Sequence, residues 1–176
     1  LGAGWFDGEH TAYGIPFPSL AERFERLGEQ LEIITGMWAT PTGDMYDSPG
    51  GHYPIAGSPA LPKPAQNPVP IVIGGGGKRK TPELAARFAT EFNTPFMSVE
   101  GFRDQSTRVS DACMANDRDP TEMTISGALP ELPTPNPPFG RGGTPSLLAV
   151  LETFATAALD PQVDGVGERR GVRAVQ

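Results

Sequence analysis

Apolar residues recur at steps of three and four between Ser19 and Gly36, which is the pattern of an amphipathic helix. Ser19 and Glu22 have the spacing of a capping box, which would start this helix, and Gly36 is expected to end it. The apolar stripe consists of Leu20, Phe24, Leu27, Leu31 and Ile34. The charged residues between these positions are expected to form a solvated face.

After residue 70, short β-branched and aromatic runs alternate with helical patterns. These runs predict strands at 71–73, 92–96 and 123–128, and helices at 82–89 and 98–116, the second capped by Ser98. One side of that second helix carries Val99, Phe102, Val109 and Cys113. Cys113 is therefore expected to pack in a core rather than to act as a nucleophile. Strands and helices that alternate at this spacing predict an α/β fold with a parallel sheet.

Glycine and proline mark two irregular regions. Residues 37–70 hold short strand patterns at 45–46 and 52–53, and their length predicts an insertion near a binding site. Prolines concentrated in residues 129–143 predict an extended or disordered linker. Residues 144–176 are expected to form one more apolar helix, a poorly structured tail and a weak strand near its end.

Composition narrows the class of protein. The chain has 176 residues, a net charge of −7 and one cysteine. The acidic balance argues against nucleic acid or an anionic membrane as the main partner, and no apolar stretch approaches the about 18 residues of a membrane span. A single cysteine cannot form an internal disulfide or a cysteine-based zinc site, so a cytoplasmic location is expected. The opening has no initiator methionine and no basic leader, and it reads as the interior of a longer protein.

A strand pattern, four glycines and three cations follow one another between Ile71 and Lys80. Glycines adopt backbone angles that other residues avoid and have no side chains to block a ligand. Thr81 and Pro82 are expected as the N-cap and first residue of the next helix. A strand, a glycine-rich loop and a helix N-terminus together form a cradle for an anion. Residues 74–79 are here called the glycine loop. Their pattern predicts that the chain binds a phosphorylated ligand.

The glycine loop fits neither common nucleotide-binding motif. Arg79 stands where a Walker A loop needs serine or threonine and where the dinucleotide-binding pattern needs glycine. The alternative interpretation is a flexible surface turn with a solvated cationic patch.

A second group of reactive side chains lies near the N-terminus. Residues 2–5 are expected to end a strand, and sites in parallel α/β proteins lie at the carboxyl ends of strands. Glu9 could serve as a general acid or base, and His10 could transfer a proton near neutral pH. The alternative is that Glu9 caps a local helix and His10 is a surface histidine. The only other histidine, His52, is distant and has no paired spacing, so no metal site is predicted.

Several of these segments together resemble the bacterial luciferase-like monooxygenase family, in particular its coenzyme F420-dependent oxidoreductases. The resemblance covers about the first 126 residues. It is carried by Gly2-Ala3-Gly4-Trp5, Glu9-His10, Tyr13 to Pro18, Glu22-Arg23, Leu61 to Gln66, Pro68 to Lys80, Leu84 to Ala89 and Glu91-Phe92-Asn93.

The resemblance implies a partial TIM (β/α)8 barrel in residues 1–128, from about its fourth strand onward and with residues 37–70 as an insertion. It implies coenzyme F420, or alternatively FMN, as the cofactor and a small organic molecule as the substrate, in hydride transfer or monooxygenation. The residues implied to bind the cofactor are Gly4, Trp5, Gly74, Gly75, Gly76, Gly77, Lys78 and Arg79. Glu9 would lie with Gly4 and Trp5 at the mouth of the barrel.

Two departures from the family keep alternatives open. A full barrel needs about 250 residues, and the proline-rich stretch after residue 127 replaces the family's usual sequence. A fragment without activity, a non-catalytic phosphate-binding module and a truncated product are therefore further interpretations. The sequence does not decide whether the chain forms a homo-oligomer.

Overall fold

The structure is a computed structural model, which describes residues 1–128, 174 and 175. The chain divides into a first unit, Leu1–Ile71, and a second unit, Val72–Gln176. The predictions for the linker at 129–143 and the helix that follows lie outside the described residues.

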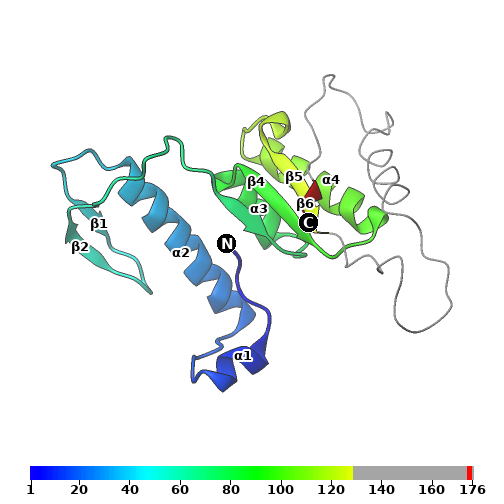
Figure 1. The fold of residues 1–176 in the computed structure, drawn as a ribbon, viewed down its shortest axis with the longest axis horizontal. Helices are drawn as coiled ribbons and strands as arrows, with labels where there is room; N and C mark the ends of the chain where they lie inside the picture. The colour runs from blue at the N-terminus through cyan, green and yellow to red at the C-terminus, as the bar shows by residue number, and fades with distance from the viewer. Residues whose placement is uncertain (129–173, 176) are drawn as a thin grey trace, which may run out of the picture. The chain divides into compact units, whose positions relative to one another are not determined.

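The first unit is built on one long helix (Figure 1). Its elements are α1 (Asp7–Ala12), α2 (Leu20–Ala39) and an antiparallel hairpin of β1 (Tyr46–Ser48) and β2 (Ile55–Ser58). Residues 1–6 form no strand, so the strand end expected at residues 2–5 is absent. No described strand pairs with residues 2–5, and a strand exists only through hydrogen bonds to a neighbour.

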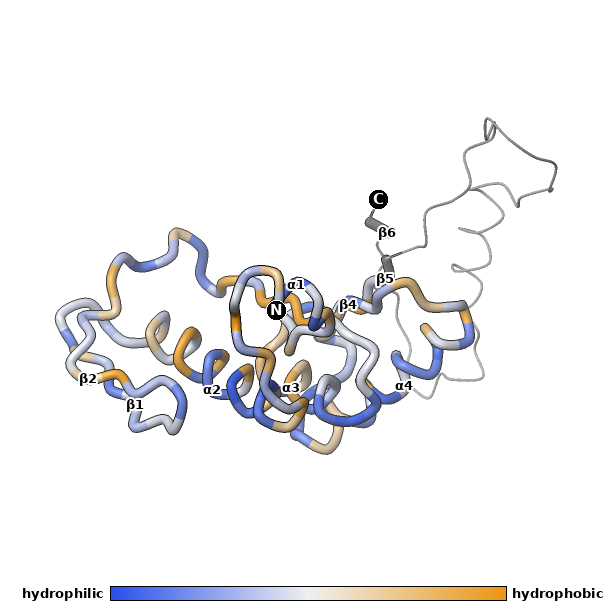
Figure 2. Tube along the Cα trace, turned by 90° about the horizontal axis from the view of Figure 1, so that it is seen from below, coloured by the Kyte–Doolittle hydropathy of each residue, from blue (hydrophilic) through white to orange (hydrophobic). Residues whose placement is uncertain are grey.

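The start of α2 confirms the sequence pattern. The Ser19 hydroxyl accepts a hydrogen bond from the Glu22 N–H at 3.2 Å, as a helix N-cap does. Hydrophobic and hydrophilic segments alternate along α2 (Figure 2). Leu27 and Leu31 are buried, whereas Leu20 is 58% exposed, so the first position of the expected stripe does not belong to the core.

The expected end of α2 at Gly36 is wrong, because the helix continues to Ala39. A methyl group on Gly36 would come within 2.5 Å of the Tyr46 ring. The glycine therefore makes room for an aromatic side chain of β1 against the helix, and its role is packing rather than termination.

The Glu29 carboxylate joins the middle of α2 to the irregular segment before β2. It accepts hydrogen bonds from the N–H of His52 at 2.9 Å and of Tyr53 at 2.6 Å. The Tyr53 hydroxyl in turn accepts from the Gln30 amide at 3.0 Å. The strand predicted at 52–53 is displaced to Ile55–Ser58, because Glu29 uses the N–H groups that a strand would pair with its neighbour.

The second unit contains a parallel sheet in the order β3-β4-β5-β6. Its elements are β3 (Val72–Gly74), α3 (Lys80–Phe88), β4 (Glu91–Pro95), α4 (Val99–Ala115), a 3-10 turn η1 (Pro120–Glu122), β5 (Thr124–Ala128) and β6 (Ala174–Val175). The predicted strands and helices agree with these to within one or two residues at each end. The predicted parallel α/β sheet is confirmed, and closure into a barrel is not seen in the described residues.

The core of this unit lies between the sheet and its two helices. Ile73 of β3 and Phe92 of β4 pair in register and are fully buried. Val109 and Cys113 of α4 are fully buried too, and α3 and α4 pack against each other. Burial raises the pKa of the Cys113 thiol, which keeps it protonated and fits the packing role predicted for it.

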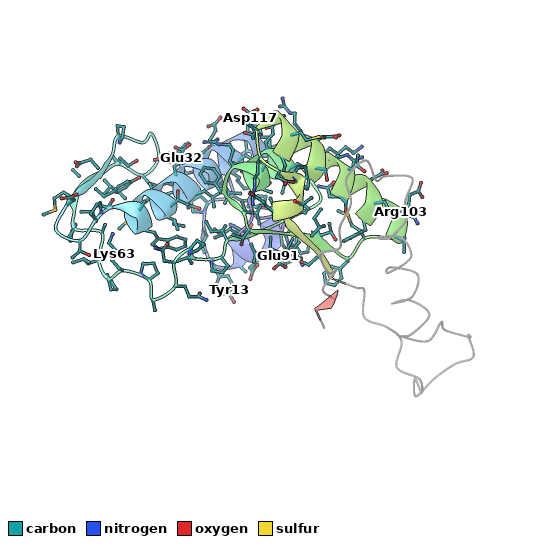
Figure 3. All side chains as sticks on the ribbon, turned by 90° about the horizontal axis from the view of Figure 1, so that it is seen from above. Tyr13, Glu32, Lys63, Glu91, Arg103 and Asp117 are labelled. Atoms are coloured by element: carbon teal, nitrogen blue, oxygen red, sulfur yellow. The ribbon has the colours of Figure 1, made fainter. Side chains whose placement is uncertain are left out.

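Arg118 holds the carboxyl end of α3. Its Nη1 donates hydrogen bonds to the carbonyls of Ala86 at 3.1 Å and Ala89 at 2.6 Å. Arg118 follows α4 next to Asp117, and Figure 3 shows Asp117 and Arg103 at opposite ends of that helix. A cation here satisfies terminal carbonyls and opposes the helix dipole, so it connects the two helices at one end of the unit.

None of the described helices combines the length and the apolar character that crossing a bilayer requires.

We expect the Glu29→Gln substitution to release the segment at His52 and Tyr53. Desolvation raises the pKa of Glu29, but the hydrogen bonds from the His52 and Tyr53 N–H groups outweigh it and leave the pKa below its ordinary value. The stabilisation of this segment by Glu29 is therefore complete at pH values above the ordinary glutamate pKa. It is lost as the pH falls through the lowered pKa of Glu29. Hydrogen exchange of the two amides, corrected for intrinsic rates, measures this loss. Glu32→Gln, on the exposed side of the same helix, should leave both amides protected.

We expect Arg118→Met to destabilise the second unit by about 1–2 kcal/mol, because carbonyls at the end of α3 lose a charged donor. Urea unfolding followed by circular dichroism measures the change. Arg79→Met, at the opposite and exposed end of α3, removes an arginine that forms no side-chain cap and should change the free energy of unfolding by less than about 0.5 kcal/mol. Equal effects of the two substitutions would contradict this role for Arg118.

Candidate functional site

The glycine loop begins where β3 leaves the sheet. Gly75 has a φ of +145° and donates its N–H to the Asn93 carbonyl of β4 at 3.2 Å. After Gly75, the backbone N–H groups from Gly76 to Thr81 donate to no other group among the described residues. A consecutive set of free donors is therefore present at the carboxyl edge of a parallel sheet.

The helix after the loop starts earlier than predicted. Its first residue is Lys80, and Arg79 is the N-cap but forms no side-chain hydrogen bond there. Thr81 and Pro82 lie inside the first turn and are buried, so the prediction that they are the N-cap and first residue is wrong. Proline is tolerated in the first turn because its missing N–H would have no partner in the helix. The N-terminus of α3 therefore has no side-chain cap, and its free N–H groups can bind an anion.

Close packing explains two of the glycines. A methyl group on Gly77 would collide with the Thr81 side-chain hydroxyl, Oγ1. A methyl group on Gly76 would come within 3.0 Å of only the terminal methyl of Met97, which can move. The loop therefore folds back on the first turn of α3 at Gly77 and is more open at Gly76.

Three cationic residues belong to the same stretch of chain as these donors. Lys78 and Arg79 are exposed and Lys80 is half-buried. Opposite the loop, the side-chain amide of Gln105 in α4 donates to the Gly77 carbonyl at 2.8 Å. Backbone donors, a helix N-terminus and positive side chains together form a site suited to a phosphate group.

Sequence reasoning missed a polar network between β4 and β5. The Asn93 amide donates to the Ser126 hydroxyl at 2.9 Å, and this hydroxyl donates to the Glu91 carboxylate at 2.6 Å. Ser126 is fully buried. The sequence does contain a signal for this network. Glu91 and Asn93 alternate with the apolar Phe92, and alternate residues of a strand face the same side, so this pattern could have shown that the two polar side chains lie together.

Gln105 was missed for a different reason. It lies at steps of three and four between Phe102 and Val109, so its position belongs to the apolar stripe, although its side chain is polar. A polar residue on such a stripe must find a hydrogen-bond partner when it is buried. The presence of a polar residue on an apolar stripe could therefore have identified Gln105 from the sequence.

The residues predicted near the N-terminus lie in the first unit. Trp5 is 86% exposed, and Gly4 has a φ of +76° that favours glycine. Glu9 lies in the exposed first turn of α1. His10 is half-buried, with its ring against Phe17 at 4.6 Å between centroids.

The His10 contacts define its proton positions. Nδ1 lies 3.0 Å from the Phe6 carbonyl, which can only accept a hydrogen bond. Nδ1 therefore carries a proton, and in the neutral ring Nε2 is the basic atom. The hydrogen bond to Phe6 thus holds the neutral His10 ring in one tautomer.

No group of three or more histidine, cysteine, aspartate or glutamate residues suited to a metal ion occurs in residues 1–128.

Comparison with known proteins shows which family has a sequence similar to this chain. A family described as luciferase-like monooxygenase matches residues 1–133. An FMNH2-dependent dimethylsulfone monooxygenase of Pseudomonas putida is 32% identical over 114 residues, which are 65% of this chain and 31% of the relative. An F420-dependent glucose-6-phosphate dehydrogenase of Nocardia farcinica is 34% identical over 91 residues, or 52% of this chain and 24% of the relative. The chain therefore spans a third or less of the length of these relatives.

Solved structures show the same architecture. An F420-dependent secondary alcohol dehydrogenase in complex with an F420-acetone adduct matches 72% of this chain and 37% of its own chain, with a TM-score of 0.63 and 19% identity. An EDTA monooxygenase from Chelativorans covers 71% and 34% of the two chains, with a TM-score of 0.57 and 20% identity. At this identity the likeness concerns the fold.

We expect Gly77→Ala to destabilise the second unit by about 1–3 kcal/mol, since the new methyl collides with a side chain fixed in a helix. Gly76→Ala is the matched control and should cost less, because Met97 can move its terminal methyl. Chemical denaturation of both variants measures the difference. A Gly77→Ala protein as stable as the Gly76→Ala protein would contradict the close contact.

Proposed function

Because this chain belongs to the luciferase-like monooxygenase family, we propose that it is part of a flavin- or deazaflavin-dependent oxidoreductase and that the glycine loop binds the cofactor phosphate. The observation that carries this proposal is the row of unpartnered N–H groups from Gly76 to Thr81. Groups of this kind are available to an acceptor, and the helix dipole and the cations of the same stretch favour a negatively charged one.

The residues present fit a phosphate. The loop N–H groups can donate to its oxygens, while Lys78 and Arg79 are free to approach it from solvent. A side chain at Gly77 would fill space beside Thr81 and push the loop from its path. When bound, the flavin or deazaflavin ring supplies the acceptor or donor of a hydride.

The family and its structural neighbours imply an α/β fold of the TIM-barrel type. We propose that residues 1–128 form a segment of such a barrel from about its fourth strand onward, with 37–70 as an insertion. In barrels of this type the sites lie at the carboxyl ends of the strands, which is where β3 leads into the glycine loop. The activity proposed for the whole protein is hydride transfer or monooxygenation of a small organic molecule, and the region matched here is 31% of the length of the Pseudomonas putida relative.

We propose that Gly4 and Trp5 lie at the mouth of the barrel near the cofactor, with Glu9 and His10 as the candidate acid–base residues. The support for His10 is its tautomer, because the hydrogen bond at Nδ1 leaves Nε2 as a proton acceptor. The support for Trp5 is its large exposed ring, which is available to a ligand.

Coenzyme F420 is the proposed cofactor, with FMN as the alternative. Among the relatives, the dehydrogenase of Nocardia farcinica is F420-dependent and the monooxygenase of Pseudomonas putida is FMNH2-dependent. A cytoplasmic location and a homo-oligomeric state complete the proposal.

We expect the full chain to bind F420 or FMN, and quenching of cofactor fluorescence measures the affinity of each. Lys78→Gln and Arg79→Gln should each weaken binding about five- to tenfold, more at low salt, because each removes a charge near the phosphate. Arg87→Gln removes a cation from the last turn of α3 and should leave the affinity unchanged.

Failure of the chain to bind either cofactor would overturn the proposal. Binding without any redox turnover would favour the second candidate, a phosphate-binding module without catalysis. The observation that favours this candidate is that the free N–H groups of the glycine loop suit a phosphate whether or not a redox ring is attached to it.

A further inference from the structure

Gln105 is a buried polar residue that lies outside the glycine loop. It belongs to α4, and only 1% of its surface is exposed. Its neighbours on the same stripe, Phe102 and Val109, are buried apolar residues. Burying a carboxamide costs free energy unless both its ends are hydrogen-bonded, so the position calls for a specific explanation.

Both ends of the Gln105 carboxamide have partners. Nε2 donates to the Gly77 carbonyl at 2.8 Å, and Oε1 accepts from Arg108 Nη1 at 3.2 Å. The Arg108 guanidinium also lies 3.5 Å from the Asp104 carboxylate. A carbonyl only accepts and a guanidinium only donates, so the two partners require the same orientation of the amide.

The hydrogen bond at Gly77 has a consequence for the next residue. The peptide between Gly77 and Lys78 is trans, since the cis bonds of the described chain lie elsewhere. In a trans peptide, C=O and N–H point in opposite directions. Gln105 holds the carbonyl on the α4 side, and the Lys78 N–H therefore points away from α4, where it has no partner among the described residues.

The glycine loop needs such a restraint. Four successive glycines have more accessible backbone conformations than any other tetrapeptide, and ordering them costs entropy when a ligand binds. A buried side chain that holds one peptide plane reduces this cost before binding.

We propose that Gln105 is a positioning residue, which orients the Gly77–Lys78 peptide so that the Lys78 N–H points toward a bound phosphate. This inference rests on the proposed function of the glycine loop. It adds a residue of α4 that determines the affinity of the loop without touching the ligand.

The test compares variants of the full chain in titrations with inorganic phosphate and with the better-bound cofactor. Gln105→Met keeps the side-chain volume and removes the donor. Gln105→Glu keeps the shape and places a carboxylate against the Gly77 carbonyl. We expect each to weaken binding about five- to tenfold, as for the loss of a hydrogen bond and its orientation. Thr107→Val, an exposed position on the same helix, is the control and should bind like the wild type.

Two readouts distinguish positioning from a general loss of stability. In the wild type, phosphate should shift the Lys78 amide resonance in a 15N–1H spectrum, and this shift should be lost in Gln105→Met while the spectrum stays dispersed. In Gln105→Glu, protonation of the new carboxylate at low pH restores an O–H donor. The difference in affinity between this variant and the wild type, measured at the same pH, should therefore shrink as the pH falls.

The outcomes separate this inference from the proposed function. If the wild type binds neither phosphate nor cofactor, the proposed function fails and the inference fails with it. If the wild type binds and Gln105→Met binds equally well, the inference alone is overturned. A Lys78 amide in the wild type that does not respond to phosphate, while those of Gly76 and Gly77 do, would also overturn it, even if the variants do not fold.

Discussion

The hydrogen bond from the Gly75 N–H to the Asn93 carbonyl is the constraint on which the second unit's site depends. It is the point where β3 stops pairing with β4 and the chain turns toward α3. Before it, backbone groups are satisfied by the sheet, and after it the N–H groups of six successive residues have no partner among the described residues. Parallel strand register therefore determines where free N–H groups become available, and the helix that follows adds the favourable dipole.

The two helices support this edge in different ways. The first turn of α3 packs its Thr81 hydroxyl against Gly77, so the loop cannot move inward. From α4, Gln105 reaches the carbonyl of the same glycine. At the far end of the unit, Arg118 joins the end of α3 to the segment after α4. The position of the glycine loop thus depends on the packing of both helices, although only one of them is adjacent to it in sequence.

The first unit shows how one side chain can replace regular structure. The Glu29 carboxylate takes two backbone N–H groups of the segment before β2, and this segment then has no need of a strand partner. The pattern of aromatic residues at 52–53 indicates a strand, since aromatic residues favour strands. A carboxylate 23 residues away overrides this preference with two charge-assisted hydrogen bonds.

The alternation of strands and helices after residue 70 could be predicted from the amino-acid pattern alone, as could the caps at Ser19 and Ser98 and the position of the glycine loop. These features depend on periodicity and on local backbone chemistry, which a single sequence records. Other features depend on tertiary contacts. They are the end of α2, the true start of α3, the hairpin register and the roles of Glu29, Gln105 and Arg118. Each of these depends on a partner that is distant in sequence or in another element, as with Tyr46 on Gly36 and Gln105 on Gly77. Such contacts become visible only when folding brings the two residues together.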